Sequence, residues 1–73
     1  MPKKIKELKK MLRKAGFTEK PAKGSHTKWS HHLLSGKIIL SGKDKDDAKS
    51  YQEKDVEQAI EKIQEIQNKQ GEE

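Results

Sequence analysis

The chain contains no cysteine, which excludes disulfide scaffolds, cysteine-ligated zinc fingers and thiol nucleophiles. Its longest fully apolar run, Ile38–Leu40, is far shorter than the roughly 18 residues that a membrane span needs. The basic start of the chain is not followed by the apolar stretch of a signal peptide. We therefore expect a small cytoplasmic protein that has no contact with a membrane.

Apolar residues are also scarce, at 29% of the 73 residues, whereas 40% are charged. Leu, Ile, Val and Phe together contribute 13 residues, below the level of roughly 20% at which disorder becomes an option. A chain of this length can form one domain that buries about 60% of its unfolded surface. We expect a single domain over residues 1–73, with an ordered core at about 3–66 and a frayed C-terminal tail. The oligomeric state stays open.

Charge is distributed unevenly along the chain. Residues 1–40 carry a net charge of +9, and residues 41–73 carry −4. A basic half favours polyanions, because each phosphate that a cation neutralises releases counterions. Lysines are equally typical of a solvated helix face. Charge alone therefore leaves both nucleic acid and an acidic protein as partners.

Two amphipathic segments predict a helix near each end. From Lys3 to Ala15 the apolar residues recur every three or four positions, and Gly16 suits the left-handed position after a helix. Ser50 and Glu53 fit a capping box, in which each side chain bonds the backbone of the other. An apolar stripe follows, formed by Val56, Ala59, Ile60, Ile63 and Ile66. The polar residues after about Gln67 are expected to fray.

Three short strands are predicted between these helices, at residues 17–20, 25–31 and 37–40. Trp29 is the only large aromatic residue for so small a core, so its face of the strand should point inward. That orientation turns His26 and Lys28 toward solvent or a ligand. The expected fold is α+β in the order α-β-β-β-α, with two helices on one face of an antiparallel sheet. Double-stranded-RNA-binding domains have this connectivity.

Two short segments carry a more specific pattern. The first helix ends in Gly16-Phe17, and Gly24-Ser25-His26 opens the second strand, with Trp29 three residues after the histidine. Over residues 3–63 the chain resembles the HicA family, the small mRNA-cleaving toxins of prokaryotic toxin–antitoxin pairs. The resemblance implies that His26 is the catalytic histidine of a ribonuclease. It also implies that a cognate antitoxin of the HicB type binds and silences the protein.

Histidine suits this chemistry because it can take the proton of a ribose 2′-hydroxyl near neutral pH. Such a route needs neither a metal nor another cofactor. Lys23 or Lys28 would stabilise charge on the phosphate oxygens. Gly24 would let the backbone approach RNA closely, and Ser25 would offer a hydroxyl or N–H to a phosphate.

Other polar groups have simpler interpretations. His31 and His32 are expected on the surface, with a general acid as the less favoured role for one of them. Zinc binding by the three histidines is not favoured, because neighbouring strand residues point to opposite faces. The acidic run Asp44–Asp47 lacks the ligand spacing of a calcium loop.

One stretch departs from the family pattern. Many members of the family carry a Pro- or His-containing stretch after the third strand, whereas this chain has Leu-Ser-Gly-Lys at 40–43. If that stretch places or protonates the leaving group in the family, Lys43 is the residue available here.

Three functional hypotheses follow. The leading one is a metal-independent endoribonuclease toxin with His26 as general acid and base and mRNA as substrate. The alternative is a non-catalytic RNA-binding module of the same fold, in which His26 contacts a phosphate. The third is a small protein-interaction domain whose basic face meets an acidic partner.

Overall fold

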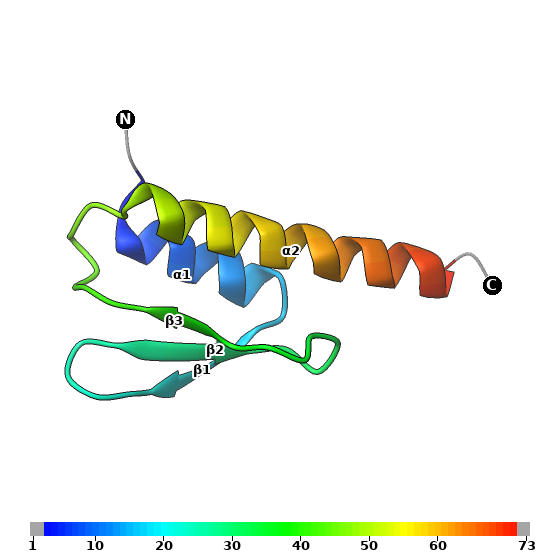
Figure 1. Cartoon of the computed structure of the whole chain (residues 1–73), viewed down its shortest axis with the longest axis horizontal. Coiled ribbons are helices and arrows are strands. Elements are labelled where there is room, and N and C mark those ends of the chain that lie inside the picture. The colour runs from blue at the N-terminus through cyan, green and yellow to red at the C-terminus, as the bar shows by residue number, and fades with distance from the viewer. Residues whose placement is uncertain (1–2, 72–73) are drawn as a thin grey trace.

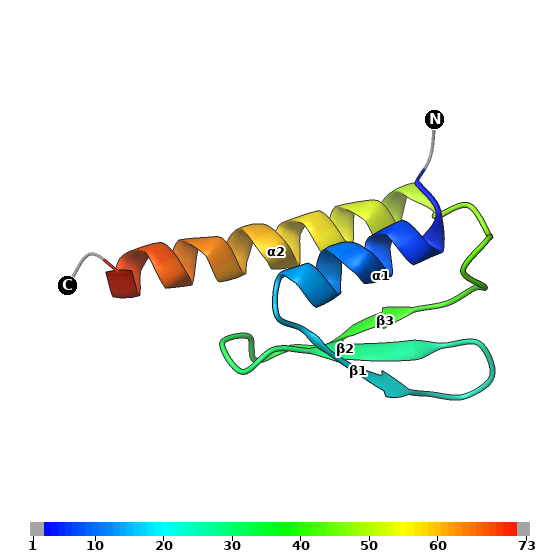
Figure 2. The same ribbon diagram turned by 180° about the vertical axis from the view of Figure 1, so that it is seen from behind.

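A computed structural model describes residues 3–71 and confirms the α-β-β-β-α order. The elements are α1 (Ile5–Lys14), β1 (Thr18–Pro21), β2 (Thr27–Ser30), β3 (Ile38–Leu40) and α2 (Ser50–Gly71). Both helices lie against the same face of the sheet, and α2 extends well beyond the end of α1 (Figures 1 and 2). Within residues 3–71 no helix combines the length and hydropathy that crossing a membrane requires.

The sheet is antiparallel throughout, with β2 between β1 and β3. Trp29, at the centre of β2, is fully buried beneath the helices, as its position in the strand predicts. Its indole Nε1 donates a hydrogen bond of 2.9 Å to Thr27 Oγ1. Lys28 lies on the opposite, exposed face, where it pairs in register with Lys20 and Ile39. One face of the sheet is therefore core, and the other is open.

The core is a single cluster that joins both helices to β2 and β3. Its fully buried large side chains are Trp29, Ile5, Leu8, Leu12, Leu40, Ile63 and Val56. The stripe that predicts α1 therefore supplies three of these residues, and the stripe that predicts α2 supplies two. The amphipathic pattern and the packing agree, which favours one folded state over disorder.

The end of α1 has the terminating geometry that Gly16 predicts. Gly16 adopts a φ of 96°, which L-residues with a Cβ rarely adopt. Phe17 N donates to Leu12 O at 3.0 Å, and Gly16 N donates to Arg13 O at 3.0 Å. This pair of bonds is a Schellman motif, and it turns the chain directly into β1.

The start of α1 is completed by a distant part of the chain. No side chain in the described residues caps this helix. Instead, Ile5 N donates to Asp46 O at 2.9 Å, and Lys6 N donates to Asp44 O at 3.1 Å. These carbonyls belong to residues 41–49, the segment between β3 and α2, which we call the capping loop. Figure 1 shows it beside the first turn of α1.

The capping box expected at Ser50 and Glu53 is wrong by one residue. Lys49 precedes the helix, and its N–H donates to Gln52 Oε1 at 2.9 Å. Gln52 is buried, and its Nε2 donates to the carbonyl oxygen of Ser41 at 3.1 Å. An amide can accept one bond and donate the other, whereas the carboxylate of Glu53 can only accept. Gln52 therefore links the helix start to the capping loop.

The other end of α2 also differs from expectation. The polar residues after Gln67 continue the helix to Gly71, where the sequence predicts fraying. Residues 1–2 and 72–73 of the expected single domain lie outside the described residues. Lys, Gln and Asn carry only small helix penalties, so a helix need not end where its apolar stripe ends.

Candidate functional site

His26 lies in the turn between β1 and β2, one residue before the strand begins. The expected strand over 25–31 is shorter at both ends, so Ser25 and His26 belong to the turn. His26 N donates to Lys23 O, and Ala22 N donates to His26 O, both at 3.1 Å. Gly24 has a φ of 64°, which accounts for glycine at this position. The turn therefore fixes the backbone of His26 while its ring remains exposed.

The imidazole of His26 is oriented by the same turn. Its Nδ1 lies 2.9 Å from the carbonyl oxygen of Lys23. A carbonyl oxygen can only accept, so Nδ1 must carry the hydrogen in this contact. In the neutral ring, Nε2 then holds the free lone pair. The turn thus presents an exposed histidine whose outer nitrogen can accept a proton.

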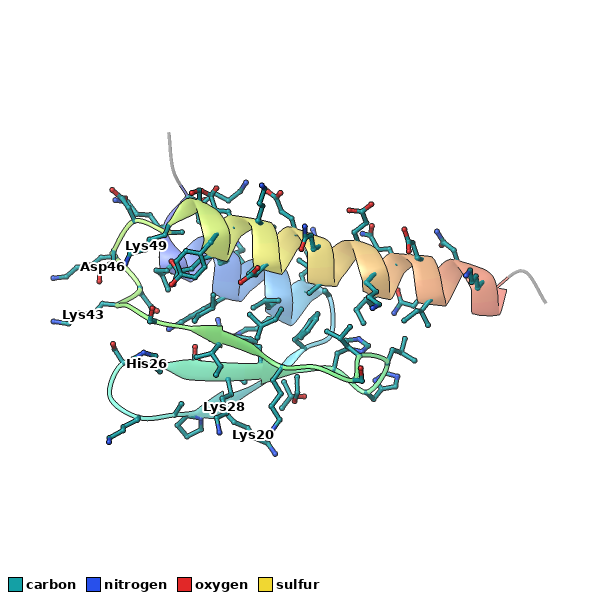
Figure 3. All side chains as sticks on the ribbon, viewed as in Figure 1. Lys20, His26, Lys28, Lys43, Asp46 and Lys49 are labelled. Atoms are coloured by element: carbon teal, nitrogen blue, oxygen red, sulfur yellow. The ribbon has the colours of Figure 1, made fainter. Side chains whose placement is uncertain are left out.

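An open groove of about 740 Å³ surrounds this ring. One wall is the β1–β2 turn, with Gly24, Ser25 and His26, and the other is the capping loop from Gly42 to Lys45. Lys9 of α1 also lines it. Figure 3 shows His26 and Lys43 at the same end of the molecule, on two different segments. The groove therefore combines one histidine with three lysines and with the carboxylates of Glu19 and Asp44.

Ion pairs attach the capping loop to α1. Lys9 Nζ lies 2.6 Å from Asp44 Oδ1, and the side chain of Lys9 is only 13% exposed. The hydrogen bond from Lys9 holds the pKa of Asp44 below the usual carboxyl range. Lys4 Nζ lies 2.5 Å from Asp47 Oδ1, and this bond raises the pKa of Lys4. Lys4, which directly precedes α1, and Lys9 within α1 therefore both form ion pairs with the capping loop.

The predicted site residues divide between two places. Gly24 and Ser25 line the groove with His26, whereas Lys23 and Lys28 do not. Lys23 contributes its carbonyl oxygen to the histidine. Lys28 points from the open face of the sheet, close to Lys20 (Figure 3). Gly24, Ser25 and His26 thus lie together in the groove at the end of the sheet, whereas Lys28 lies on the adjoining open face.

Three lysines of the groove come from elsewhere in the chain. The sequence indicates Lys43 only as a replacement for the Pro- or His-containing stretch of the family, and it gives no indication of Lys9 or Lys45. The capping loop reaches the groove because it completes the first turn of α1. No local signal in the sequence predicts that contact, although the dense charge of residues 43–47 marks the segment as exposed.

The expected surface position of His31 is wrong, because this ring is only 6% exposed. Its Nδ1 accepts a hydrogen bond from Leu33 N at 3.0 Å, and its ring meets Phe17 edge-on at 5.1 Å. Gly16 makes the space: a Cβ there would lie 3.2 Å from His31 Nε2. His32 is exposed as expected and stacks on His31.

Both of these histidines follow β2, whereas His26 precedes it. The five residue steps from His26 to His31 span about 16 Å in extended chain, so neither of these rings lies beside the ring of His26. Among the described residues, no group of three or more His, Asp or Glu side chains is placed to hold a metal ion. The groove therefore offers one histidine and several cations, a set suited to proton transfer beside a phosphate.

A comparison with models of known protein families matches most of the chain. Residues 5–64 match the family model described as the HicA toxin of bacterial toxin–antitoxin systems. Searches of curated proteins and of solved structures returned no significant match. The matched segment runs from the first residue of α1 through Ile63 at the end of the core, and it includes the whole groove. On this match, together with the fold and the Gly-Ser-His turn, the chain belongs to the HicA family of toxins, which act in pairs with an antitoxin.

Proposed function

We propose that this toxin is an endoribonuclease that cleaves mRNA without a metal ion, with His26 as general base and acid. The observation that carries this proposal is the contact of His26 Nδ1 with the Lys23 carbonyl. It selects the tautomer in which Nε2 is a base, and it does so on an exposed ring in a groove where Lys43 and Lys45 form no ion pair among the described residues. A histidine that only contacted phosphate would need no such orientation.

The reaction begins when Nε2 of His26 takes the proton of a ribose 2′-hydroxyl. The 2′-oxygen then forms a bond to the adjacent phosphorus, and the bond from phosphorus to the 5′-oxygen breaks. The leaving 5′-oxygen takes its proton from water or from the protonated His26 ring. This route gives a 2′,3′-cyclic phosphate and a 5′-hydroxyl. It requires a 2′-hydroxyl at the cleaved position, so DNA is not a substrate.

The neighbouring residues suit an RNA backbone. Gly24 leaves open space above the turn, since nothing lies within 4 Å of the position of an added Cβ. Ser25 lines the groove with its hydroxyl. Lys28 and Lys23 are exposed next to it, and their cations would hold phosphates on either side of the cleaved bond. The RNA then crosses from the groove to the open face of the sheet.

The antitoxin of this toxin is, in our proposal, a protein of the HicB type that covers the groove. A groove open to solvent supports this mode, because a protein bound over it would exclude RNA without altering the fold. Since the substrate is mRNA, the protein would act in the cytoplasm. Adding the purified cognate antitoxin should abolish cleavage at an equimolar ratio.

The test is cleavage of a short labelled RNA by purified protein in excess chelator. We expect the wild type to cleave, and His26→Gln to reduce the rate by about 10²-fold or more, as is typical for loss of a general base. His32→Gln is the matched control, because His32 is exposed and lies at the far end of β2. It should cleave at the wild-type rate.

A second substrate checks the chemistry. The same RNA with a single 2′-deoxy nucleotide at the cleaved position should bind but stay intact. Cleavage of that substrate, or equal cleavage by His26→Gln, would contradict the proposal. Salt-sensitive RNA binding without cleavage by the wild type would favour the RNA-binding module instead.

A further inference from the structure

The capping loop brings a second chemical group to the histidine. Lys43 lines the same groove as His26, although 17 positions in the sequence separate the two residues. In Figure 3 the side chain of Lys43 extends toward solvent at the end of the sheet where His26 lies. An ammonium group on a long stem can follow a phosphate over several ångströms. A phosphodiester beside His26 is therefore within the region that Lys43 can reach.

The backbone of Lys43 is held by two hydrogen bonds to Asp46. Lys43 N donates to Asp46 Oδ2 at 3.0 Å, and Lys43 O accepts from Asp46 N at 2.9 Å. Gly42, with a φ of 107°, makes the bend before it. Among the described residues, neither the backbone N–H nor the backbone carbonyl of Lys45 forms a hydrogen bond. Of the two loop lysines that line the groove, Lys43 and Lys45, Lys43 is thus the one whose backbone is fixed by hydrogen bonds.

The loop itself is anchored to α1. Its carbonyls complete the first turn of the helix, and Asp44 pairs with Lys9. In this pair the cation of Lys9 is matched by a carboxylate. The other carboxylate that lines the groove, Glu19, is paired with Arg13 at 3.0 Å. Among the described residues, Lys43 and Lys45 form no ion pair. Their charges remain available to an anion.

We propose that Lys43 is a second catalytic residue of this toxin, whose ammonium stabilises the charge that develops on the phosphate during cleavage. This assignment rests on the proposed function. As the 2′-oxygen bonds to phosphorus and the 5′-oxygen leaves, negative charge grows on the two non-bridging oxygens. Lys43 donates a hydrogen bond to one of them and keeps its proton throughout. Asp46 is the positioning residue, because its hydrogen bonds fix the backbone from which the Lys43 side chain extends.

The test measures single-turnover cleavage in chelator by wild type, Lys43→Met, Lys43→Arg and Lys37→Met. Methionine keeps most of the aliphatic stem of Lys43 and removes its charge. Lys37 is an exposed lysine outside the groove and serves as the matched control. The same substitutions in a His26→Gln background, in which cleavage is expected to be about 10²-fold slower or more, give the RNA affinity separately from the chemistry.

We expect Lys43→Met to lower the single-turnover rate at least roughly tenfold, less than the 10²–10³-fold seen for donors in water-excluded sites. Lys43→Arg should recover most of the rate, and Lys37→Met should equal the wild type. The RNA affinity in the His26→Gln background should fall much less than the rate. Asp46→Ala should lower the rate too, and Asp46→Asn, which keeps an acceptor for Lys43 N, should restore it.

Each other outcome has one meaning. An unchanged rate for Lys43→Met, or a loss that appears entirely in affinity, overturns the assignment and leaves the role of His26 intact. A loss that is equal in Lys37→Met shows a general charge effect and also overturns it. Cleavage that does not depend on His26 refutes the proposed function and this assignment with it. If circular dichroism shows that Lys43→Met is unfolded, the cleavage rates of Asp46→Ala and Asp46→Asn test the assignment instead. Equal rates in these two variants would overturn it.

Discussion

Lys9 and Asp44 form an ion pair of 2.6 Å that joins the middle of α1 to the capping loop. Lys9 is nearly enclosed, whereas the side chain of Asp44 is 65% exposed. Helix and loop are separated by 35 positions in the sequence, so this pair is a tertiary contact on one wall of the groove. The contribution of this ion pair to stability can be measured from the pH dependence of the free energy of unfolding.

Asp44→Asn should remove a stabilising contribution that depends on pH. The pKa of Asp44 is lowered in the folded state, so its contribution is fully present above the ordinary carboxyl pKa of 3.8. It is lost as the pH falls through the lower folded value. Urea unfolding should therefore give the wild type a higher free energy of unfolding than the variant at neutral pH. This difference in free energy should close below pH 3.8. A gap that widens on acidification would contradict this.

Thr27→Val should destabilise the protein by about 1–3 kcal/mol, because the indole N–H of Trp29 would lose its partner in a partly buried place. Thr27→Ser keeps the hydroxyl and is the matched control. Urea denaturation followed by circular dichroism gives both free energies of unfolding. Equal losses in the two variants would assign the effect to the methyl group rather than to the hydrogen bond.

Gly16→Ala should cost about 1–2 kcal/mol, since alanine is strained at a φ of 96° and its Cβ would press on His31. Gly36→Ala is the control, because a Cβ there meets nothing within 4 Å. For a chain of this size, the expected loss lowers the unfolding midpoint by roughly 4–16 °C. Similar midpoints for the two variants would show that the Schellman turn tolerates a side chain.

His26 and His31 should occupy opposite neutral tautomers. The Lys23 carbonyl requires the hydrogen on Nδ1 of His26, whereas Leu33 N–H requires an unprotonated Nδ1 on His31. Long-range ¹H–¹⁵N correlation spectra, recorded where both rings are neutral, distinguish the two forms by the nitrogen shifts. An Nε2–H tautomer at His26 would remove the orientation on which the proposed general base depends.

Lys28→Ala should weaken RNA binding and lower the slope of log affinity against log salt by about one. This follows if Lys28 neutralises one phosphate on the open sheet face. Binding is measured in the His26→Gln background at several salt concentrations, with Lys62→Ala on α2 as a control for total charge. An unchanged slope would place the RNA away from this face.

The elements of the fold could be predicted because their signals are local. The three-and-four spacing of Ile5, Leu8 and Leu12 predicts α1, and Gly16 predicts its end. The need to bury Trp29 orients β2 and hence turns Lys28 outward. Each of these depends on neighbouring residues and on elementary geometry.

The site could be predicted only in part, for the opposite reason. His26, Gly24 and Ser25 are adjacent in sequence and are found through one motif. Lys9 and Lys45 are brought to the groove by contacts between distant segments, which no local pattern encodes. The same limit explains the errors: Gln52 caps α2 because Ser41 is near it, and His31 is buried because Gly16 leaves room.

The completion of α1 by the capping loop has a consequence for the newborn chain. A helix of ten residues without a local cap is marginal in water, and its first turn here depends on carbonyls some forty positions downstream. An emerging polypeptide that ends before residue 42 lacks both this cap and the second wall of the groove. Since the core also needs Val56 and Ile63 of α2, folding awaits the synthesis of that helix. A translating ribosome thus carries a precursor without a completed core until α2 has been made.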